Sequence, residues 1–482
     1  MKTYLFTCVG SALLALLATP IVIRLARRIG AVDEPGLRKV HKEGVPRIGG
    51  VVLFVSSLGP LLAVLLLQNR VGETFRAVLP KIVALLAASS LMFFVGLIDD
   101  FKQMRARKKL VAQIIAAVVV CYVGVRIESV VVGDWLTISF GWFSWPVTIL
   151  WIVGLTNAVN LSDGLDGLAA GISAVACGVI AMLAIWTGQA VMAVLMLALL
   201  GSLSGFLYFN FNPARIFLGD SGSMFLGFTI AASSVMCLTK SQALVGLALP
   251  ALALGIPIFD TLFSMLRRFL ERRSLFAPDQ SHFHHRLLAL GLKQRHAVIV
   301  AYALTCVLAG LGLFMILTRG VESVVLLCCI FVLLLLVFRV VGSVHLRETV
   351  AGLQKKHAIA RARDQERRRF EEAQLRIHRA EGFDGWWGAM CEAGGCMDFA
   401  WVSLKREEED GTITTDVWRR PGFEPELSRV AVVRLPIRAG VVRGLMEFEI
   451  GVMVNGSLES AGRRASLFGR LIDEYAPGGA GQ

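Results

Sequence analysis

The feature that most limits how this chain can fold is a series of apolar blocks, each about twenty residues long. A helix of about twenty residues is long enough to cross the roughly 30 Å hydrocarbon layer of a bilayer. Of the 482 residues, 55% are hydrophobic and only 18% are charged, whereas a soluble domain carries about a quarter charged residues. The chain is therefore predicted to be an integral membrane protein, and a soluble globular fold is excluded.

The apolar windows predict an all-α polytopic fold with about eleven membrane-spanning helices. These lie at residues 4–23, 49–67, 79–98, 110–125, 145–160, 167–186, 190–208, 222–239, 244–266, 297–317 and 322–341. The first block has the alternative of being a signal peptide, but only Lys2 precedes it and Arg27 and Arg28 follow it closely. We expect this block to be retained as the first span.

The charge of the loops predicts the orientation, because Lys and Arg are retained on the cytoplasmic side. One set of alternate loops carries most of the loop cations, whereas the opposite set holds only Arg70, Arg76, Lys81, Arg126, Lys240 and Arg319. The N-terminus is therefore expected outside and the C-terminus in the cytoplasm. Topology and contact with anionic lipid then explain the net charge of +13, without a nucleic-acid partner.

Several classes of function lack their sequence motifs. The nine cysteines are scattered without the spacing of a disulfide framework or a zinc site. No GxxxxGK[ST], GxSxG or HExxH motif is present, so ATP-driven transport, serine hydrolysis and zinc proteolysis are not indicated.

Nearly all acidic, amide and histidine residues of the membrane part lie in loops on the predicted cytoplasmic side. Asp99 and Asp100, in GLIDD, end a span, where adjacent carboxylates are costly unless a cation or metal offsets them. A solvated helix end is the plain alternative. The motif NAVNLSDGLDG adds Asn160, Asp163 and Asp166, whose oxygens suit Mg2+ beside a phosphate, or else simply cap helices and turns.

Two further motifs add phosphate-binding and stacking groups. In NFNPARIFLGDSGS, Asp220 is either a helix cap or a metal ligand, and Phe217 is either a core residue or a platform for a nucleobase. The basic loop with SHFHHR is interpreted as a cation clamp for a diphosphate, with anionic lipid as the alternative partner. A zinc site is disfavoured there. The cationic residues of the motif are His282, His284, His285 and Arg286.

These motifs together predict a metal-assisted phosphotransferase acting at the bilayer surface. A polytopic transporter would instead place ionisable groups along the middle of its spans, and these spans are nearly free of them until Asp260. The second alternative is a scaffold protein without catalytic activity that acts only through its C-terminal domain. The complete set of motif residues disfavours it.

The same motifs resemble the polyprenyl-phosphate N-acetylhexosamine-1-phosphate transferases, a family that includes the phospho-MurNAc-pentapeptide translocase. The resemblance covers about residues 1–340 and follows one order through VDEPGLRKVHKEGVPRIGG, GLIDD, NAVNLSDGLDGLAAG, FNPARIFLGDSGSMFLG and PIFDTLFSMLRRFLERRSLFAPDQSHFHHRLL. It implies an enzyme of the bacterial inner membrane that transfers a sugar 1-phosphate from a UDP-sugar to undecaprenyl phosphate and releases UMP. The HFHHR form is more similar to the branch that uses UDP-GlcNAc; another UDP-HexNAc or UDP-MurNAc-pentapeptide is the alternative donor.

The resemblance also implies a role for each motif residue. Asn160 and Asp220 would ligate Mg2+, which Mn2+ can replace, and Asp99 and Asp100 would lie close to the acceptor phosphate. Catalytic roles are implied for Asp220, His284 and His285 beside the Asp99–Asp100 pair. The residues expected to hold the UDP-sugar are Asp163, Asp166, Asn210, Phe217, Lys109, His282 and Arg286. A homodimer is consistent with the resemblance.

The last third of the chain differs in composition from the membrane part. Residues 1–342 are predicted to form the transmembrane transferase domain, 343–384 a charged helical linker, and 385–482 a small cytoplasmic α+β domain. Short alternating runs such as FAWVSLKR and GLMEFEIGV predict strands in that domain. Its residues leave sensing, dimerisation and recruitment of another enzyme open as roles.

Overall fold

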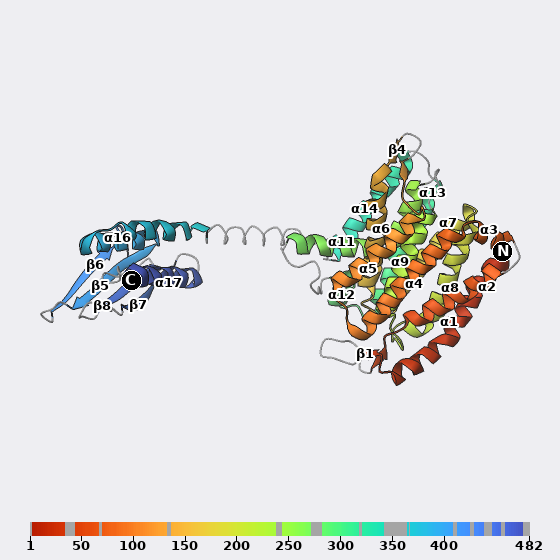
Figure 1. The fold of residues 1–482 in the computed structure, drawn as a ribbon, viewed down its shortest axis with the longest axis horizontal. Helices are drawn as coiled ribbons and strands as arrows, with labels where there is room; N and C mark the ends of the chain where they lie inside the picture. Colours follow the sequence, from red (N-terminus) through yellow and green to blue (C-terminus); the bar gives the residue numbers. More distant parts are fainter. Residues whose placement is uncertain are drawn as a thin grey trace. The chain divides into compact units, whose positions relative to one another are not determined.

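The computed structural model of the chain contains two compact units, each with its own hydrophobic core (Figure 1). The first unit is Met1–Thr349 and the second is Val350–Gln482. The residues that the structure describes are 2–33, 44–66, 70–132, 136–237, 243–270, 282–317, 321–341, 364–365, 367–407, 412–424, 429–437, 446–454 and 458–475.

Every apolar block predicted from the sequence is helical in the first unit. Ten blocks correspond to single helices, and the ninth is broken into α10 and α11, which are bent by 79° relative to each other. The helices are α1 (Lys2–Arg28), α2 (Gly50–Leu66), α4 (Leu79–Lys102), α5 (Ala106–Tyr122), α6 (Ser144–Ser162), α7 (Leu168–Trp186), α8 (Ala190–Asn210), α9 (Gly219–Met236), α10 (Ala243–Ala253), α11 (Gly255–Leu270), α13 (Gln294–Leu317) and α14 (Val321–Val340).

Short elements connect these helices. They are helix α3 (Arg70–Ala77), helix α12 (Phe283–Ala289), a single 3-10 turn at Gly141–Phe143, and two antiparallel strand pairs, β1 (Val32–Asp33) with β2 (Val45–Pro46) and β3 (Ser129–Val132) with β4 (Leu136–Ser139). Among them, α12 carries most of the HFHHR motif.

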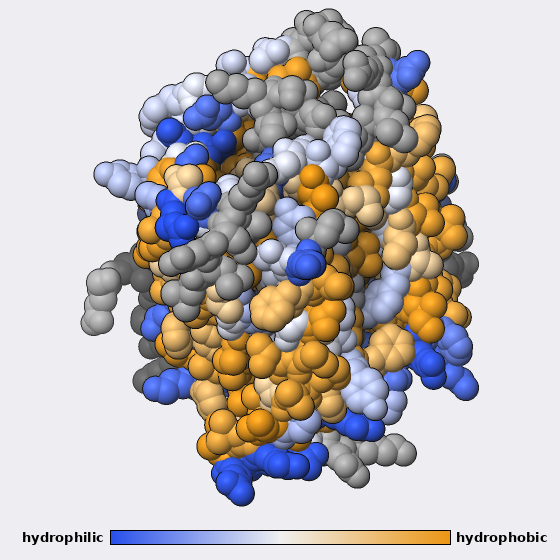
Figure 2. All heavy atoms as spheres, turned by 90° about the vertical axis from the view of Figure 1, so that its right-hand side faces the viewer, coloured by the Kyte–Doolittle hydropathy of each residue, from blue (hydrophilic) through white to orange (hydrophobic). Residues whose placement is uncertain are grey.

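The first unit has the surface of a multi-pass membrane protein. Among the described residues, seven helices are long and apolar enough to cross a bilayer, and the bent α10–α11 pair makes up to eight. Large apolar side chains face outward, as at Leu17 in α1, which is 68% exposed, and Leu336 in α14, which is 51% exposed. Figure 2 shows apolar side chains over the middle of one flank and hydrophilic ones toward its ends. The multi-pass fold is therefore confirmed, whereas the number of eleven spans is not.

Small residues allow close packing between helices that are distant in sequence. A Cβ atom at Gly201 of α8 would lie 2.0 Å from the Cys8 carbonyl oxygen, and one at Gly205 would lie 2.4 Å from that of Ala12. Helices in a bilayer associate through such close backbone contacts, because apolar burial against lipid contributes little. The sequence of α8 therefore fixes its contact with α1.

Helix α9 lies at the centre of the unit and is buried from Ser221 to Val235. Its first turn is enclosed by glycines on two neighbouring helices. A Cβ at Gly96 of α4 would lie 2.4 Å from the Asp220 carbonyl oxygen, and one at Gly50 of α2 would lie 2.3 Å from the Gly222 nitrogen. The start of α9 is therefore held at one end of the bundle, against the last turn of α4.

The second unit is a four-stranded antiparallel sheet with helices packed on one face. The strands are β5 (Phe399–Glu407), β6 (Ile413–Arg419), β7 (Val430–Ile437) and β8 (Met446–Met453), in the order β6-β5-β8-β7. Helices α16 (Gly382–Cys396) and α17 (Leu458–Tyr475) cover the face that presents Val402, Leu404, Phe448, Ile450 and Val452, all fully buried. The predicted small C-terminal sheet domain is thus present.

Candidate functional site

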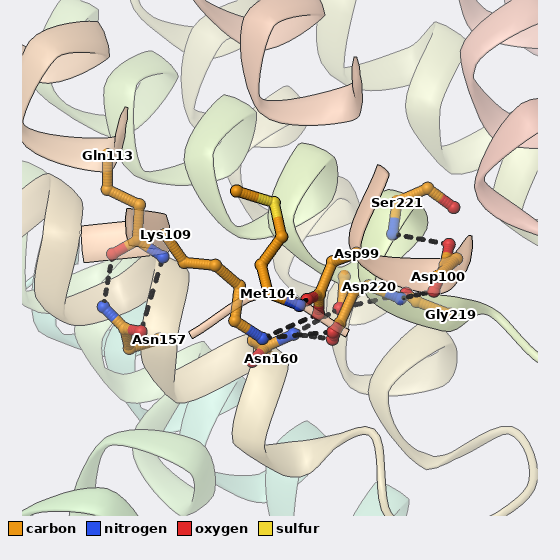
Figure 3. A network of polar contacts seen from close by, with 11 residues as sticks. Asp99, Asp100, Met104, Lys109, Gln113, Asn157, Asn160, Gly219, Asp220 and Ser221 are labelled. Atoms are coloured by element: carbon orange, nitrogen blue, oxygen red, sulfur yellow. Dashed lines mark hydrogen bonds and ion pairs between the residues drawn. The ribbon is translucent and has the colours of Figure 1, made fainter. Parts of the chain in front are cut away.

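Four elements from distant parts of the sequence meet at the end of the bundle where α9 begins (Figure 3). Asp99 lies in the last turn of α4, Lys109 in the first turn of α5, Asn160 in the last turns of α6, and Asp220 in the first turn of α9. The sequence motifs predicted this convergence, and the contacts between the four side chains define the centre of the candidate site.

The ammonium group of Lys109 lies between two carboxylates. Its Nζ is 2.8 Å from Asp99 Oδ2 and 3.2 Å from Asp220 Oδ2. The other oxygen of Asp99 accepts the backbone N–H of Met104, just beyond the end of α4. One cation thus offsets the repulsion between the carboxylates of Asp99 and Asp220.

Asn160 completes the contacts of Asp220. Its Nδ2 donates to Asp220 Oδ1 at 2.6 Å and to Ser223 Oγ at 2.8 Å. Rotation of this amide by 180° would put its oxygen in the same place, since the two ends of an amide have nearly the same shape. Asn160 and Asp220 therefore lie side by side, as expected for two ligands of one ion.

Asp100 differs from its neighbour Asp99 because it faces the backbone of α9. Its Oδ1 accepts the N–H of Asp220 at 2.8 Å and its Oδ2 accepts the N–H of Ser221 at 3.0 Å. These are among the N–H groups that have no partner within a helix, and a carboxylate there also suits the positive end of the helix dipole. Asp100 thus caps α9 and fixes the position of Asp220.

Asp163 follows the C-terminus of α6 and lies close to these acids. Burial and the nearby carboxylates of Asp220 and Asp100 together raise the pKa of Asp163 to about 8, against a backbone hydrogen bond from Gly219 that lowers it. The part of this rise that comes from Asp220 and Asp100 reflects the negative charge gathered there. The centre of the site therefore favours a bound cation.

The donor set fits Mg2+ rather than zinc. Mg2+ is commonly held by one or two carboxylates together with waters and substrate phosphates, and it prefers oxygen ligands. The oxygens of Asp220, Asn160 and Asp99 provide such a partial set. Within the described residues, no three His, Cys, Asp or Glu side chains form a cluster able to hold a metal by themselves. The residues present therefore fit an ion that shares its ligands with a phosphate substrate.

Asp166 and Asn210 both brace the segment between α8 and α9. Asp166 Oδ2 accepts the Asn212 side-chain N–H at 2.9 Å and the Ala214 backbone N–H at 3.1 Å. Asn210 is buried, and its Nδ2 donates to the Ile216 carbonyl oxygen at 2.8 Å. These contacts shape the segment that carries Phe217. The predicted contacts of Asp166 and Asn210 with a nucleotide remain predictions.

Phe217 is half-buried and is placed by the backbone of the preceding loop. Its N–H donates to the Pro46 carbonyl oxygen at 2.7 Å, and its carbonyl oxygen accepts the Gly49 N–H at 3.0 Å. The VPRIGG motif of the resemblance therefore supports the residue expected to stack on a base. Beside it, the Nε of Arg47 is buried without a hydrogen-bond partner among the described residues. Arg47 was not predicted as a site residue from the sequence. Its position within the VPRIGG motif is the feature that could have indicated it.

The histidine motif is anchored by an acidic residue of α11. Asp260 Oδ2 lies 3.0 Å from His282 Nδ1, and its Oδ1 accepts the Phe283 N–H at 2.8 Å, so it caps α12 from outside that helix. Asp260 and His282 are both buried. In the sequence, Asp260 is notable as an ionisable residue within an apolar block. That position alone did not indicate its role.

His284 packs against the NAVNLSDGLDG motif. A Cβ at Gly164 would lie 2.4 Å from His284 Nε2. Burial and the neighbouring histidines His285 and His282 together lower the pKa of His284 to about 3, so its ring is neutral. His285 is exposed, and its ring centroid lies 4.4 Å from that of His284. A neutral His284 therefore lacks the positive charge expected of a cation clamp.

A fixed positive charge remains in this motif. The Nε of Arg286 is buried and has no hydrogen-bond partner among the described residues. A buried donor without a partner is costly, and a phosphate oxygen would satisfy it. Arg286 and Lys109 are thus the cations of the motifs best suited to an anionic substrate.

The distribution of buried charge disfavours a permeation route. In the described part of the membrane unit, the carboxylates with the lowest exposure are Asp99, Asp100 and Asp260, and all belong to the contacts described above. A transporter would need polar groups along the depth of the bilayer. Fold and site together define a polytopic membrane protein with an acidic polar site at one end of its bundle.

Comparison with known proteins assigns the chain to a narrower class of membrane protein. A sequence profile described as glycosyl transferase family 4 matches residues 82–238. A probable undecaprenyl-phosphate N-acetylglucosaminyl 1-phosphate transferase of Bacillus subtilis is 42% identical over 294 residues, 61% of this chain and 79% of that protein. The decaprenyl-phosphate N-acetylglucosaminephosphotransferase of Mycobacterium tuberculosis H37Rv is 35% identical over 315 residues, 61% of this chain and 77% of that protein.

A third relative represents the peptidoglycan branch. The phospho-N-acetylmuramoyl-pentapeptide-transferase of Halalkalibacterium halodurans is 30% identical over 336 residues, 65% of this chain and 98% of that protein. The chain belongs to glycosyl transferase family 4, among the polyprenyl-phosphate N-acetylhexosamine-1-phosphate transferases that its motifs predicted.

Proposed function

We propose that this protein transfers N-acetylglucosamine 1-phosphate from UDP-GlcNAc to a polyprenyl phosphate and releases UMP. The names of the relatives support the transfer, and the higher identity to the N-acetylglucosaminyl enzymes than to the pentapeptide transferase supports the sugar. The structural observation that carries the proposal is the Lys109 ammonium shared by Asp99 and Asp220, beside Asn160. The product would start a cell-envelope polysaccharide on its lipid carrier.

In the proposed reaction, an oxygen of the polyprenyl phosphate forms a bond to the β-phosphorus of the UDP-sugar. The bond between that phosphorus and the oxygen bridging to the α-phosphate breaks, and UMP leaves with the electron pair. Lys109 and Arg286 are placed to neutralise charge that develops on the phosphoryl oxygens, which is the main task of an enzyme in such a transfer.

The acidic residues then have separate roles. Asp220 and Asn160 would hold Mg2+, with Asp99 on the other side of Lys109. When bound, Mg2+ supplies positive charge to the phosphate oxygens. Asp99 orients the acceptor phosphate through Lys109 rather than removing a proton, since a phosphate monoester is largely ionised at neutral pH. Asp100 acts on the reaction only through the position of Asp220.

The location of the site suits an amphipathic acceptor. The charged motifs lie where apolar helices end, so a phosphate head can reach Lys109 while its prenyl chain stays among lipid tails. The excess of loop cations on this side supports a cytoplasmic site in the bacterial inner membrane. UDP-sugars and the second unit would then be on the same side.

The test is lipid-dependent release of UMP by purified protein. UDP-GlcNAc, UDP-GalNAc and UDP-MurNAc-pentapeptide are supplied separately with undecaprenyl phosphate and Mg2+. We expect UMP from UDP-GlcNAc alone, its loss in Asp220→Asn and with EDTA, and its retention in Glu128→Gln, an exposed carboxylate outside the site. Release from the pentapeptide donor would overturn the assigned sugar, and no release by folded, lipid-supplied protein would overturn the reaction.

A further inference from the structure

The second unit contains a hollow on the sheet face that its helices leave open. In each strand, residues alternate between the two faces. Trp401 and Ser403 of β5, Val417 and Arg419 of β6 and Glu449 of β8 belong to the open face, and they line a cavity of about 710 Å3. Cavities that hold small organic ligands have volumes of roughly 300–1,000 Å3. The hollow is therefore large enough for a compact metabolite.

Two aromatic rings form walls of this cavity. The indole of Trp401 lies over Gly451 of β8, where a Cβ would come within 2.6 Å of three ring atoms. Glycine inside a strand weakens the sheet and commonly marks a close approach of another group. Phe423, just after the turn at Gly422, places its ring centroid 6.0 Å from that of Trp401 at an angle of 56°. A flat ring entering the cavity would therefore meet aromatic surface.

Charge is unevenly distributed around the same cavity. Glu449 is neutralised by Arg434, whose Nε lies 2.9 Å from its carboxylate. Arg420 pairs with Asp398 at 3.1 Å, but Asp398 already lies within 4 Å of two other guanidinium groups, those of Arg369 and Arg464. The carboxylate is thus shared among three cations, and the end of the cavity near Arg420 has an excess of positive charge.

Arg419 adds to this excess. It lies directly opposite Trp401 in the strand register, is exposed, and makes no ion pair with any residue that the structure describes. Glu424 also lines the cavity. A guanidinium beside an aromatic face suits a ligand that combines a planar ring with a phosphate, because the ring stacks while the fork of N–H groups binds phosphate oxygens.

We propose that this cavity, with Trp401 and Phe423 as stacking surfaces and Arg419 and Arg420 as phosphate-binding groups, is a nucleoside phosphate site separate from the transferase site. The proposal does not rest on the function of the membrane unit. It gives the C-terminal unit the role of a nucleotide sensor, for which a ligand site made of other residues than those of the transferase site is required.

The test measures equilibrium binding of radiolabelled UMP, AMP and GMP to the full-length protein in detergent micelles. The Asp220→Asn background is used throughout, and excess unlabelled UDP-GlcNAc is added in parallel samples to identify binding at the transferase site. We expect saturable binding of at least one nucleotide that survives UDP-GlcNAc. Trp401→Ala should weaken it about ten-fold or more, in line with the loss of one base-stacking contact.

Variants at the surface keep the test independent of folding. Arg419→Gln changes an exposed side chain and should weaken binding at least five-fold. Lys405→Gln, at an exposed residue of β5 on the same sheet face but outside the cavity lining, should leave binding within two-fold. Absence of binding that survives UDP-GlcNAc would overturn the proposal. The proposal would also be overturned if Arg419→Gln bound the nucleotide as tightly as the protein with Arg419 does. The same holds if inorganic phosphate alone competed as well as the nucleotide, or if the variants changed the oligomeric state and left binding unchanged.

Discussion

The carboxylate of Asp100 caps the helix whose first turn carries Asp220, with both oxygens on backbone N–H groups at 2.8 and 3.0 Å. Asp99, one residue earlier, instead contacts Lys109 and Met104. Two neighbouring acids that look equivalent in the motif GLIDD therefore perform different tasks. One positions the helix that bears the predicted metal ligand, and the other lies in the ionic centre of the site.

This division predicts different effects of the same substitution at the two positions. Asp100→Asn turns an amide N–H toward the N–H groups of α9 and should destabilise the protein by about 1–3 kcal/mol, as expected for buried donors that lose a partner. Asp99→Asn keeps an oxygen for Met104 and leaves Lys109 paired with Asp220, so its stability should change less. Thermal unfolding in detergent measures both. A larger loss of stability in Asp99→Asn than in Asp100→Asn would contradict the assignment.

The motifs predicted which residues converge, but not their pairing. Asp99, Lys109, Asn160 and Asp220 were expected at one membrane face because their loops alternate with apolar blocks, and the structure brings them into contact. The cap by Asp100 could not be predicted, because it depends on the packing of α4 against α9 across a glycine contact at Gly96. Helix packing at this level is set by shape, which a one-dimensional pattern does not contain.

The charge of the histidine motif also could not be predicted from the sequence alone. From the sequence, three histidines beside an arginine indicate a positive clamp. In the fold, His284 is buried among apolar groups and other imidazoles, and burial opposes its charge. The anchor of the motif, Asp260, comes from the bent α10–α11 pair, which hydropathy reads as one continuous span.

Lys109 provides a second prediction. If its ammonium neutralises charge on the transferred phosphoryl group, Lys109→Met should lower kcat on the order of 100-fold, as for loss of one electrostatic contact to a transition state. Removing a cation beside Asp220 should not weaken the binding of Mg2+. The Mg2+ concentration for half-maximal activity should therefore stay the same or fall. UMP release as a function of Mg2+ measures both.

The adjacent Lys108 is an exposed residue of the same helix, so Lys108→Met is the matched control and should retain full activity. Asp220→Asn should instead lose UMP release at the Mg2+ concentration that saturates the wild type, because a predicted Mg2+ ligand is gone. An unchanged kcat in Lys109→Met, with only a shifted Mg2+ dependence, would remove Lys109 from the reaction.

The contact between Gly164 and His284 gives a third prediction. Gly164→Ala places a methyl group 2.4 Å from the imidazole Nε2 and should displace His284 together with the start of α12. A displacement of about 1 Å in a positioning group can reduce kcat/KM on the order of 10 to 100-fold. Kinetics with varied UDP-GlcNAc measure the effect.

Gly154→Ala is the control, because a Cβ at Gly154 of α6 meets no atom within 4 Å. This variant should keep wild-type kcat/KM. Equal kinetics for the two alanine variants would show that the histidine motif tolerates movement, and that its predicted contact with the diphosphate or sugar does not limit the reaction.

The low pKa of His284 predicts how stability depends on pH. In the fold its pKa is about 3, whereas in an unfolded chain a histidine titrates near 6.5. Between these values the unfolded chain binds more protons, so stability is complete above about pH 6.5 and falls as the pH decreases. The loss attributable to His284 should reach about 2 kcal/mol by pH 5.

Thermal midpoints between pH 7.5 and pH 5, at constant ionic strength, measure this loss. His284→Gln replaces the ring with a group that does not titrate, so its midpoint should fall less steeply with acid than that of the wild type. His378→Gln, at an exposed histidine of the second unit, should keep the wild-type slope. If His284→Gln and wild type fall in parallel, His284 is protonated in the fold as easily as in the unfolded chain, and it would then carry the charge that a cation clamp requires.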